Sequence, residues 1–318
     1  MLHVGFAFPG STVFAVIGAG NVVSQKLVPA FEMQGITGYE IHALKEDSLA
    51  HSQADVFKHR EPSELANVVA NTELIPWVAT PPFQARSAIL ESADGRSMVL
   101  EKPLGLTAND YLFCSSKLDL FRNAFVLSYY TQAKFAPLLW ALGLQEPSSR
   151  LTGYLEGGLQ VEDPPLEASL ILSEPMTRTA GDSVSPWQEK HLIELAVHGP
   201  ATLHALGLPA EELVLSESDR VEVMGPLSSA QIIRPGVDRK TVQVHTDSIN
   251  LFADGSNRSV VSTRGYLALS AETPGYLPLL ALVLDWLEDP SSNYAGGFAE
   301  QLSALELLTR SQRSDSYF

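Results

Sequence analysis

The sequence predicts an α/β protein in which a doubly wound parallel sheet is followed by an α+β domain with a largely antiparallel open sheet. Two observations carry this prediction. Apolar strand segments alternate with helical segments up to about residue 128, and short β-rich segments dominate after about residue 150. Regular alternation of strand and helix is typical of parallel strands joined by right-handed crossovers. We therefore expect two domains, at residues 1–128 and 129–318.

In the first domain, continuous apolar runs indicate parallel strands that are buried on both faces. The expected strands are Thr12–Ile17, Tyr39–Leu44, Ile75–Ala79, Ser97–Leu100 and Ala124–Ser128. The helices expected between them are Val22–Glu32, Ser63–Ala70, Pro82–Ser92 and Ala108–Leu118. Thr107 and Asp110 have the spacing of a capping box at the start of the last of these helices.

In the second domain, the short segments predict strands, and one central helix and two closing helices interrupt or follow them. The expected strands are Leu151–Val161, Leu166–Ser173, Arg220–Met224, Ala230–Arg234, Thr241–His245, Ser248–Phe252 and Ser259–Thr263. The expected helices are His191–Leu206, Leu277–Leu287 and Phe298–Arg310. Ala253–Asn257 has the composition of a hairpin turn, and we expect loops at 162–165 and Pro186.

Composition limits the classes of function. With 45% hydrophobic and 18% charged residues, the 318-residue chain can bury a large core. The net charge of −16 argues against a nucleic acid or an anionic membrane as partner, because no basic tract is present to neutralise phosphates. The single cysteine, Cys114, fits a reducing compartment and reads as a buried apolar residue. We expect no metal site, no membrane span and a cytoplasmic location.

The apolar run Phe14–Ile17 ends in Gly18-Ala19-Gly20, a turn that suits a phosphate-bearing ligand. The first glycine allows a tight turn, and the second lets the backbone approach a pyrophosphate. A helix that starts at Asn21 and Val22 would point free N–H groups and its positive dipole end at the phosphates. The alternative is a glycine turn without a ligand, and Val23 stands where the fingerprint has a third small residue.

A second string, Glu101-Lys102-Pro103, follows the apolar run Met98–Leu100. A lysine at this place can hydrogen-bond a substrate oxygen and stabilise negative charge that develops on it. Glu101 is a candidate ion-pair partner, and Pro103 can fix the backbone, with the isomer of its peptide bond left open. The alternative is a surface salt bridge at a strand end.

Taken in order along the chain, these motifs resemble those of the Gfo/Idh/MocA oxidoreductase family. The resemblance rests on strand-Gly18-Ala19-Gly20, on Ala79-Thr80-Pro81-Pro82 and on Glu101-Lys102-Pro103-Leu104. Further segments that match in order are Phe135-x-Pro137, Ser185-Pro186-Trp187, Glu194-x-x-x-His198 and the closing Phe298–Ser311. The family joins a Rossmann domain to an α/β domain with an open sheet, and the resemblance covers most of the chain.

The sequence also departs from the family pattern. Besides Val23, Phe83-Gln84 replaces a polar residue and a histidine, and Glu189-Lys190-His191 replaces a glycine-rich run. In the Asp-x-Gly-x-His motif of the central helix, Glu194 stands for the aspartate and Ala196 for the glycine, and Ala201 stands where a second aspartate often follows. These changes leave the substrate open.

The resemblance implies an NAD(P)-dependent oxidoreductase that moves hydride between nicotinamide and a carbonyl, secondary alcohol or imine of a polar small molecule, sugar- or cyclitol-like. It implies that Lys102 polarises the oxygen and that His198 carries the proton, with Glu194 one helical turn earlier. The implied cofactor-binding residues are Gly18, Gly20, Asn21, Val22, Lys45, Thr80, Pro81, Glu101 and Lys102. The implied substrate contacts are Tyr129, Tyr130 and Trp187, and a homodimer or homotetramer is implied through pairing of the open sheets.

Lys45, after the second expected strand, bears on the choice of cofactor. An acidic residue there often binds the ribose 2′-hydroxyl of NAD, whereas a lysine favours the 2′-phosphate of NADP. We therefore expect NADP, with NAD as the alternative if the alignment is shifted by one residue to Glu46.

The competing hypothesis is a catalytically silent protein of the same fold that binds a nucleotide or ligand as a sensor or partner. Val23 and the altered central helix favour it. The presence of both Lys102 and His198 favours the enzyme.

Overall fold

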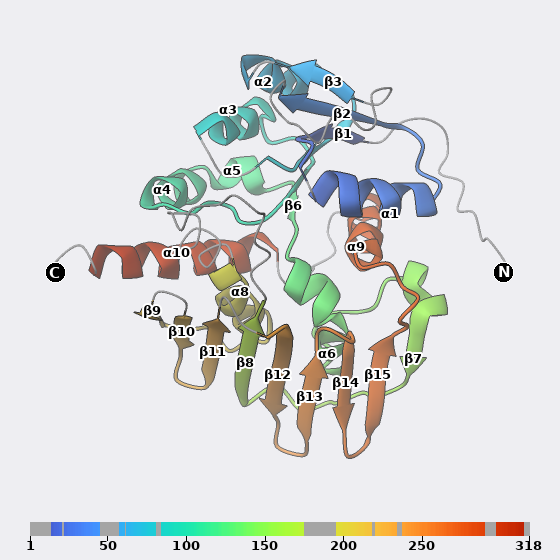
Figure 1. Ribbon diagram of the computed structural model, residues 1–318, viewed down its shortest axis with the longest axis vertical. Coiled ribbons are helices and arrows are strands. Elements are labelled where there is room, and N and C mark those ends of the chain that lie inside the picture. Colours follow the sequence, from blue (N-terminus) through green and yellow to red (C-terminus); the bar gives the residue numbers. More distant parts are fainter. Residues whose placement is uncertain are drawn as a thin grey trace.

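The computed structural model describes residues 14–20, 22–44, 57–60, 62–80, 84–174, 195–217, 220–233, 237–289 and 297–314. Two sheets lie at opposite ends of the molecule, and helices fill the space between them (Figure 1). The smaller sheet is formed by the first part of the chain and the larger one by the second, as the sequence predicted.

The smaller sheet has six strands in the order β3-β2-β1-β4-β5-β6, and all neighbours pair in parallel. The strands are β1 (Phe14–Ile17), β2 (Tyr39–Leu44), β3 (Phe57–Arg60), β4 (Ile75–Val78), β5 (Met98–Leu100) and β6 (Ala124–Val126). The strand order reverses direction between β1 and β4, which makes their carboxyl ends the topological switch point of the sheet. The edge strand β3 was not predicted.

Helices flank this sheet as expected, with two corrections. They are α1 (Val28–Met33), α2 (Pro62–Asn71), α3 (Gln84–Ser92), α4 (Ala108–Ser116) and α5 (Leu118–Phe121). The capping box of α4 is present, because the Thr107 side chain accepts the Asp110 N–H at 3.2 Å and Asp110 accepts the Thr107 N–H at 2.9 Å. The single helix expected over Ala108–Leu118 is interrupted at Lys117.

The helix after the glycine turn does not begin as an α-helix. A π-helical turn, η1 (Val23–Leu27), comes first, and the Val28 N–H bonds the Val23 carbonyl before α1 continues. Val23 is fully buried in the core that α1 shares with β1. The bulky residue at the third fingerprint position is thus accommodated in a widened turn, a feature that is frequent near functional sites.

The larger sheet has nine strands in the order β7-β15-β14-β13-β12-β8-β11-β10-β9, antiparallel except for the parallel pair β8 and β11. The strands are β7 (Leu155–Gly157), β8 (Glu167–Ser173), β9 (Glu212–Glu217), β10 (Arg220–Met224), β11 (Ser228–Ile233), β12 (Arg239–His245), β13 (Asn250–Asp254), β14 (Ser259–Ser262) and β15 (Gly265–Leu269). The predicted hairpin turn joins β13 to β14, whose residues Asp254 and Ser259 pair. Strands β9 and β15 were not predicted.

The strand predicted over Leu151–Val161 is wrong in its first half. Residues Ser149–Tyr154 form a 3₁₀ helix, η4, and only Leu155–Gly157 pair as β7. The Ser148 side chain accepts the Arg150 N–H at 3.2 Å, and this cap starts a helical turn where the apolar pattern alone indicates a strand. Gly157, at φ +85°, ends the strand beside the Tyr266 carbonyl.

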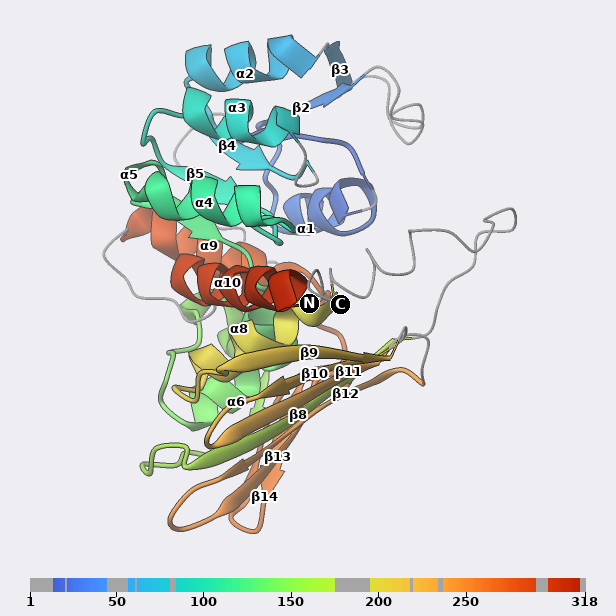
Figure 2. The same ribbon diagram turned by 90° about the vertical axis from the view of Figure 1, so that its left-hand side faces the viewer.

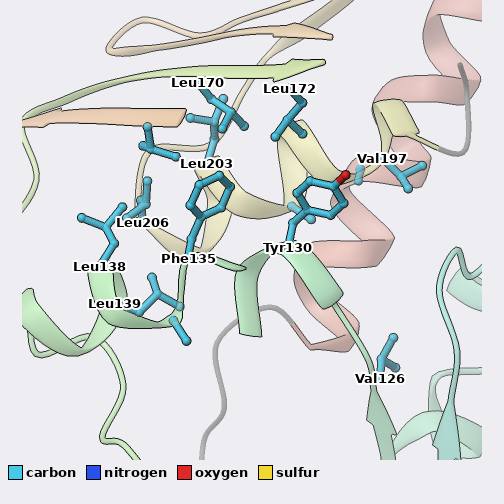
Figure 3. Packing of buried hydrophobic residues seen from close by; sticks show 14 of the residues in the cluster. Val126, Tyr130, Phe135, Leu138, Leu139, Leu170, Leu172, Val197, Leu203 and Leu206 are labelled. Atoms are coloured by element: carbon cyan, nitrogen blue, oxygen red, sulfur yellow. The ribbon is translucent and has the colours of Figure 1, made fainter. Parts of the chain in front are cut away.

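One face of the large sheet is covered by helices, and no element of the described chain covers the other (Figure 2). The covering helices are α6 (Ala136–Ala141), which was not predicted, and α8 (His198–Ala205). Residues 191–194 of the longer helix expected over His191–Leu206 lie outside the described residues. Figure 3 shows Tyr130 and Phe135 among Leu170 and Leu172 of β8 and Leu203 of α8.

The C-terminal helices return to the smaller sheet. Helix α9 (Leu277–Glu288) shares a core with Phe14 and Trp77, and α10 (Phe298–Ser314) packs on α4, β6 and α8. The two sheets are therefore joined by more than the segment after β6, and the division of the chain at residue 128 stays a prediction.

Helices that are both long and apolar enough to cross a bilayer are absent from the described ranges. The cytoplasmic location remains an expectation from the sequence.

Candidate functional site

The glycine turn lies at the switch point between β1 and β4, and its backbone fits a dinucleotide. Gly18 has φ +116°, and a Cβ added there would lie 3.1 Å from the Ala79 carbonyl carbon and 3.2 Å from the Thr80 nitrogen. A Cβ added at Gly20 would meet nothing within 4 Å, so the space beside it is open. The buried Thr80 hydroxyl has no hydrogen-bond partner among the described residues. A close backbone turn, free space and an unpaired donor are what a pyrophosphate or ribose group requires.

Of the other predicted cofactor residues, the structure describes Val22 but not Asn21, Lys45 or Pro81. Val22 is half-buried and lies beside the pocket described next.

A pocket of about 180 Å³ lies where the two halves of the chain meet. It brings together Lys102, His198, Tyr129 and Tyr130, which were predicted as site residues from separate segments. The full lining is Val22, Lys26, Glu101, Lys102, Tyr129, Tyr130, Glu174, Leu195, His198 and Tyr276. Lys26, Glu174 and Tyr276 were not predicted. The candidates Trp187 and Glu194 lie outside the described part of the chain.

The backbone on either side of Lys102 is held by a buried arginine that the sequence analysis missed. Arg86 Nη1 donates to the Pro103 carbonyl at 2.5 Å, and Nη2 donates to the Glu101 carbonyl. Burial lowers the pKa of Arg86 to about 10, which leaves it charged at neutral pH. The peptide bond between Lys102 and Pro103 is cis. Arg86 precedes the buried Ile89 by three residues, and this spacing was the available signal that it faces inward.

Glu101 is buried beneath the pocket and accepts a hydrogen bond from the Tyr276 hydroxyl. Burial raises the pKa of Glu101, and the Tyr276 hydrogen bond and the charge of Lys102 act against that increase. Burial also raises the pKa of Tyr276 well above 10, with the Glu101 charge in the same direction. Tyr276 therefore stays a hydrogen-bond donor and fixes the carboxyl group that adjoins Lys102.

His198 is the first residue of α8 and only 1% exposed. Its ring lies 4.2 Å from the Tyr130 ring, centroid to centroid, and its Nδ1 has no partner in the described ranges. Burial lowers the pKa of His198 well below 6.5, and the charges of Lys102 and Lys26 lower it further. The imidazole of His198 is therefore neutral at pH 7 in the free protein.

A network of fully buried polar side chains fixes the segment that carries both tyrosines. Ser128 Oγ donates to Thr131 Oγ1 at 3.1 Å, and Thr131 Oγ1 lies 3.1 Å from Thr202 Oγ1 on α8. Gln301 Nε2 of α10 donates to Ser128 Oγ at 3.2 Å. Gln132 Oε1 accepts the Ser128 N–H at 2.8 Å. These bonds tie the end of β6 to α8 and α10, and hence Tyr129 and Tyr130 to His198.

In sequence the protein matches no protein-family model and no curated protein. Solved structures match it over nearly its whole length. Levoglucosan dehydrogenase with NADH and levoglucosan has a TM-score of 0.69 at 13% identity, covering 97% of this chain and 98% of that one. A Gfo/Idh/MocA family oxidoreductase from Vibrio cholerae has a TM-score of 0.67 at 13% identity, covering 96% and 99%. Biliverdin reductase from Synechocystis, with biliverdin and NADP⁺, has a TM-score of 0.62 at 14% identity, covering 95% and 98%.

A parallel sheet with a glycine turn at its switch point, followed by an open and mostly antiparallel sheet, defines a class of dinucleotide-dependent oxidoreductase folds. Within that class, the chain has the fold of the Gfo/Idh/MocA-type oxidoreductases, as the resemblance predicted. The TM-scores of 0.62, 0.67 and 0.69 establish the fold, whereas sequence identities of 13% and 14% are too low to transfer a substrate to this chain. Among the described residues, no group of three or more His, Cys, Asp or Glu side chains could hold a metal ion.

The neutral state of buried His198 predicts how stability depends on pH. Below about pH 6.5 the unfolded imidazole binds a proton that the folded one rejects, so the free energy of unfolding falls as the pH drops. Glu101 acts in the opposite direction, because its raised pKa makes stability fall as the pH rises above about 4.5. The comparison with His198→Gln isolates the histidine, since Glu101 is common to both proteins.

We expect urea denaturation between about pH 5 and 7 to show a smaller pH slope for His198→Gln than for the unmodified protein. Equal slopes for the unmodified protein and His198→Gln would mean that His198 does not stay neutral in the fold.

Proposed function

We propose that this protein is an NAD(P)-dependent oxidoreductase that moves hydride between nicotinamide and a carbonyl, secondary alcohol or imine of a polar small molecule. The observation that carries the proposal is the single pocket in which Lys102 and His198 meet beside the glycine turn. Ligands of open α/β sheets bind at the carboxyl ends of the strands near the switch point, where Gly18, Gly20 and Lys102 lie.

The chain's own residues hold the cofactor and act on the oxygen that reacts. Gly18, Gly20, Val22 and Thr80 would hold the dinucleotide, with Asn21, Lys45 and Pro81 from the remaining part of the chain. When bound, NAD(P) supplies or accepts the hydride. The Lys102 ammonium donates a hydrogen bond to the reacting oxygen and stabilises negative charge on it.

His198 is neutral, so its imidazole accepts the hydroxyl proton on a ring nitrogen when an alcohol is oxidised. In the reverse direction the same nitrogen returns that proton. We assign Glu194 the role of imidazole partner, and Tyr129, Tyr130 and Trp187 the role of substrate contacts. Because Tyr276 and Arg86 fix the backbone and the carboxyl group beside Lys102, the lysine can act without reorganising its surroundings.

Single alanine variants test the two catalytic assignments. We expect Lys102→Ala to lower kcat by about 10² to 10³, comparable to the loss of one oxyanion donor. We expect His198→Ala to lower kcat by about 10² to 10⁴ with little change in cofactor affinity. The double variant should lose less than the product of the single losses, because both residues serve one transition state.

The matched control is Lys117→Ala, which removes an exposed lysine between α4 and α5 and should keep full activity. Full activity in His198→Ala would assign the proton transfer to another group. If Lys102→Ala were fully active as well, the site assignment would be wrong.

The choice of cofactor is tested at the end of β2. We propose NADP as the cofactor, since Lys45 can pair with the 2′-phosphate, and we expect NADPH to bind more tightly than NADH in fluorescence titrations. Lys45→Asp should narrow or invert the preference, whereas Glu46→Gln should leave it unchanged. Tighter NADH binding by the unmodified protein would favour the alignment that places Glu46 on the ribose. Binding of neither nucleotide would exclude both the enzyme and a nucleotide sensor.

The uncovered face of the large sheet is the proposed interface of a homodimer or homotetramer. Phe252, Val261 and Tyr266 follow one another across β13, β14 and β15 by strand register, and all three side chains are exposed. Gln243 of β12 continues the row next to Phe252. A row of exposed apolar residues on a sheet face is typical of an interaction surface.

We expect Phe252→Glu combined with Val261→Glu to convert the oligomer to monomer in sedimentation velocity experiments, because burying carboxylates against an apolar surface is costly. Leu112→Glu on α4, which also introduces a carboxylate at an exposed apolar residue, is the control and should keep the native oligomer. A double variant that keeps the assembly state of the unmodified protein would exclude this face.

A further inference from the structure

We propose that the substrate of this pocket carries an anionic group, a carboxylate or a phosphate, which binds to three cations gathered around Tyr129: Lys26, Lys134 and Arg258. This inference rests on the proposed function, because it concerns the substrate of the same site. A neutral sugar or cyclitol would not require such a cluster of cations, so the inference narrows the class of substrate.

Two of the cations lie over the ring of Tyr129. Lys26 Nζ is 4.7 Å from the ring centroid and Lys134 Nζ is 5.6 Å from it. Lys26 comes from the π-helical turn η1, and Lys134 comes from a second such turn, η3 (Tyr130–Lys134). Lys26 and Tyr129 both line the pocket that holds Lys102 and His198. The cluster therefore adjoins the space in which the reaction is proposed to occur.

Arg258 gives the strongest support for an anion-binding site. It is 8% exposed and has φ +49°, a left-handed conformation in the turn between β13 and β14 that few residues other than glycine and asparagine adopt. Its Nη2 donates to the Ser270 carbonyl at 3.1 Å, while its buried Nη1 has no partner in the described ranges. A buried guanidinium group with an unused donor loses its hydration without compensation, unless an acceptor binds there.

The positive charge of Arg258 also acts on Tyr129. Burial raises the pKa of the Tyr129 phenol, and the Arg258 charge lowers it in part. The pKa of Lys134 is lowered by burial and then by the like charges of Lys240, Arg258 and Lys26, and the Asp238 charge acts against this decrease. These cations therefore repel one another within a protein that carries 37 acidic and only 21 basic residues.

The acidic groups near the cluster are already engaged elsewhere. Glu174 accepts the Tyr130 hydroxyl and lies 3.8 Å from Lys240 Nζ, and Asp238 pairs with Lys240. Within the described chain, no carboxylate lies within ion-pair distance of Lys26, Lys134 or Arg258, although the Asp238 charge acts on Lys134 from farther away. An oxyanion of the substrate would supply a partner, through charge-assisted hydrogen bonds of the kind that lysine and arginine form with carboxylates and phosphates.

The cofactor's own pyrophosphate is the competing occupant, because Lys26 follows the glycine turn along the chain. Lys134 and Arg258 come from other elements, after β6 and after β13. Saturation of the protein with NADPH before the anion is added separates the two occupants, since the pyrophosphate site is then filled.

The test measures binding of small anions to the NADPH-saturated protein by isothermal titration calorimetry at constant ionic strength. The probes are inorganic phosphate and succinate, with the neutral polyol myo-inositol as the uncharged comparison. We expect at least one anion to bind and myo-inositol to bind more weakly. Phosphate alone would identify a phosphorylated substrate, and succinate alone a carboxylated one.

Substitution of the cluster should weaken that binding specifically. We expect Lys134→Met and Arg258→Met each to raise the Kd of the bound anion about tenfold to a hundredfold, the effect of one charged hydrogen bond. Lys117→Met, which removes an exposed lysine elsewhere, should leave the Kd unchanged. If Arg258→Met does not fold, Lys134→Met alone decides, since that side chain is only half-buried.

A second measurement follows His198 by NMR. Because the Lys26 charge lowers the pKa of His198, saturation with the anion should raise that pKa, and Lys26→Met should raise it without any ligand. NADPH binding with no anion binding, or an anion Kd unaltered in both cluster variants, would overturn the inference and leave the proposed function standing. Anion binding without NADPH binding would overturn the proposed function alone.

Discussion

The buried hydrogen-bond network of Ser128, Thr131, Thr202 and Gln301 is the constraint on which the rest of the site depends. Each of these side chains is inaccessible to water, and an unpaired polar group in such a place costs about 1–3 kcal/mol. The observed arrangement pairs the three hydroxyl groups and the Gln301 Nε2, and it leaves Gln301 Oε1 without a partner in the described ranges. The network connects the segment after β6 with η3, α8 and α10, so it holds the segment that carries both tyrosines against the helices beside the pocket.

The two halves of the site are then positioned by different means. The network positions His198, because His198 lies one helical turn before Thr202 on α8. Arg86 positions Lys102, because its guanidinium group donates hydrogen bonds to the backbone carbonyls of the residues before and after Lys102. Tyr276 connects the two halves of the chain a second time. It immediately precedes α9 in the second half, and its hydroxyl donates a hydrogen bond to Glu101 in the first half. Rigid support of this kind would keep the two proposed catalytic side chains at a fixed distance before any ligand binds.

Local patterns predicted what depends on local interactions. The parallel strands and the Thr107 cap follow from apolar runs and from a four-residue motif, and Lys102 and His198 were chosen as candidates because each lies in a short motif. The edge strand β3 was missed because Phe57-Lys58-His59-Arg60 has no apolar alternation. Tyr276 could not be assigned to the site from sequence, since its role exists only through a contact 175 residues away. The same holds for Arg258, whose turn gives no sign of what lies beside it.

The low pKa of His198 and the unpaired cations are two aspects of one electrostatic arrangement. The charges of Lys102 and Lys26 both oppose protonation of the His198 imidazole. An imidazolium formed by taking a proton from an alcohol would therefore be repelled by both lysines. An anionic substrate changes this balance, because its charge offsets Lys26 next to Tyr129 and reduces the repulsion that an imidazolium would meet. The base would then gain strength only when the substrate is in place. On this reasoning the cation cluster serves binding and proton transfer together, and a neutral substrate at the same position would leave His198 a poor base.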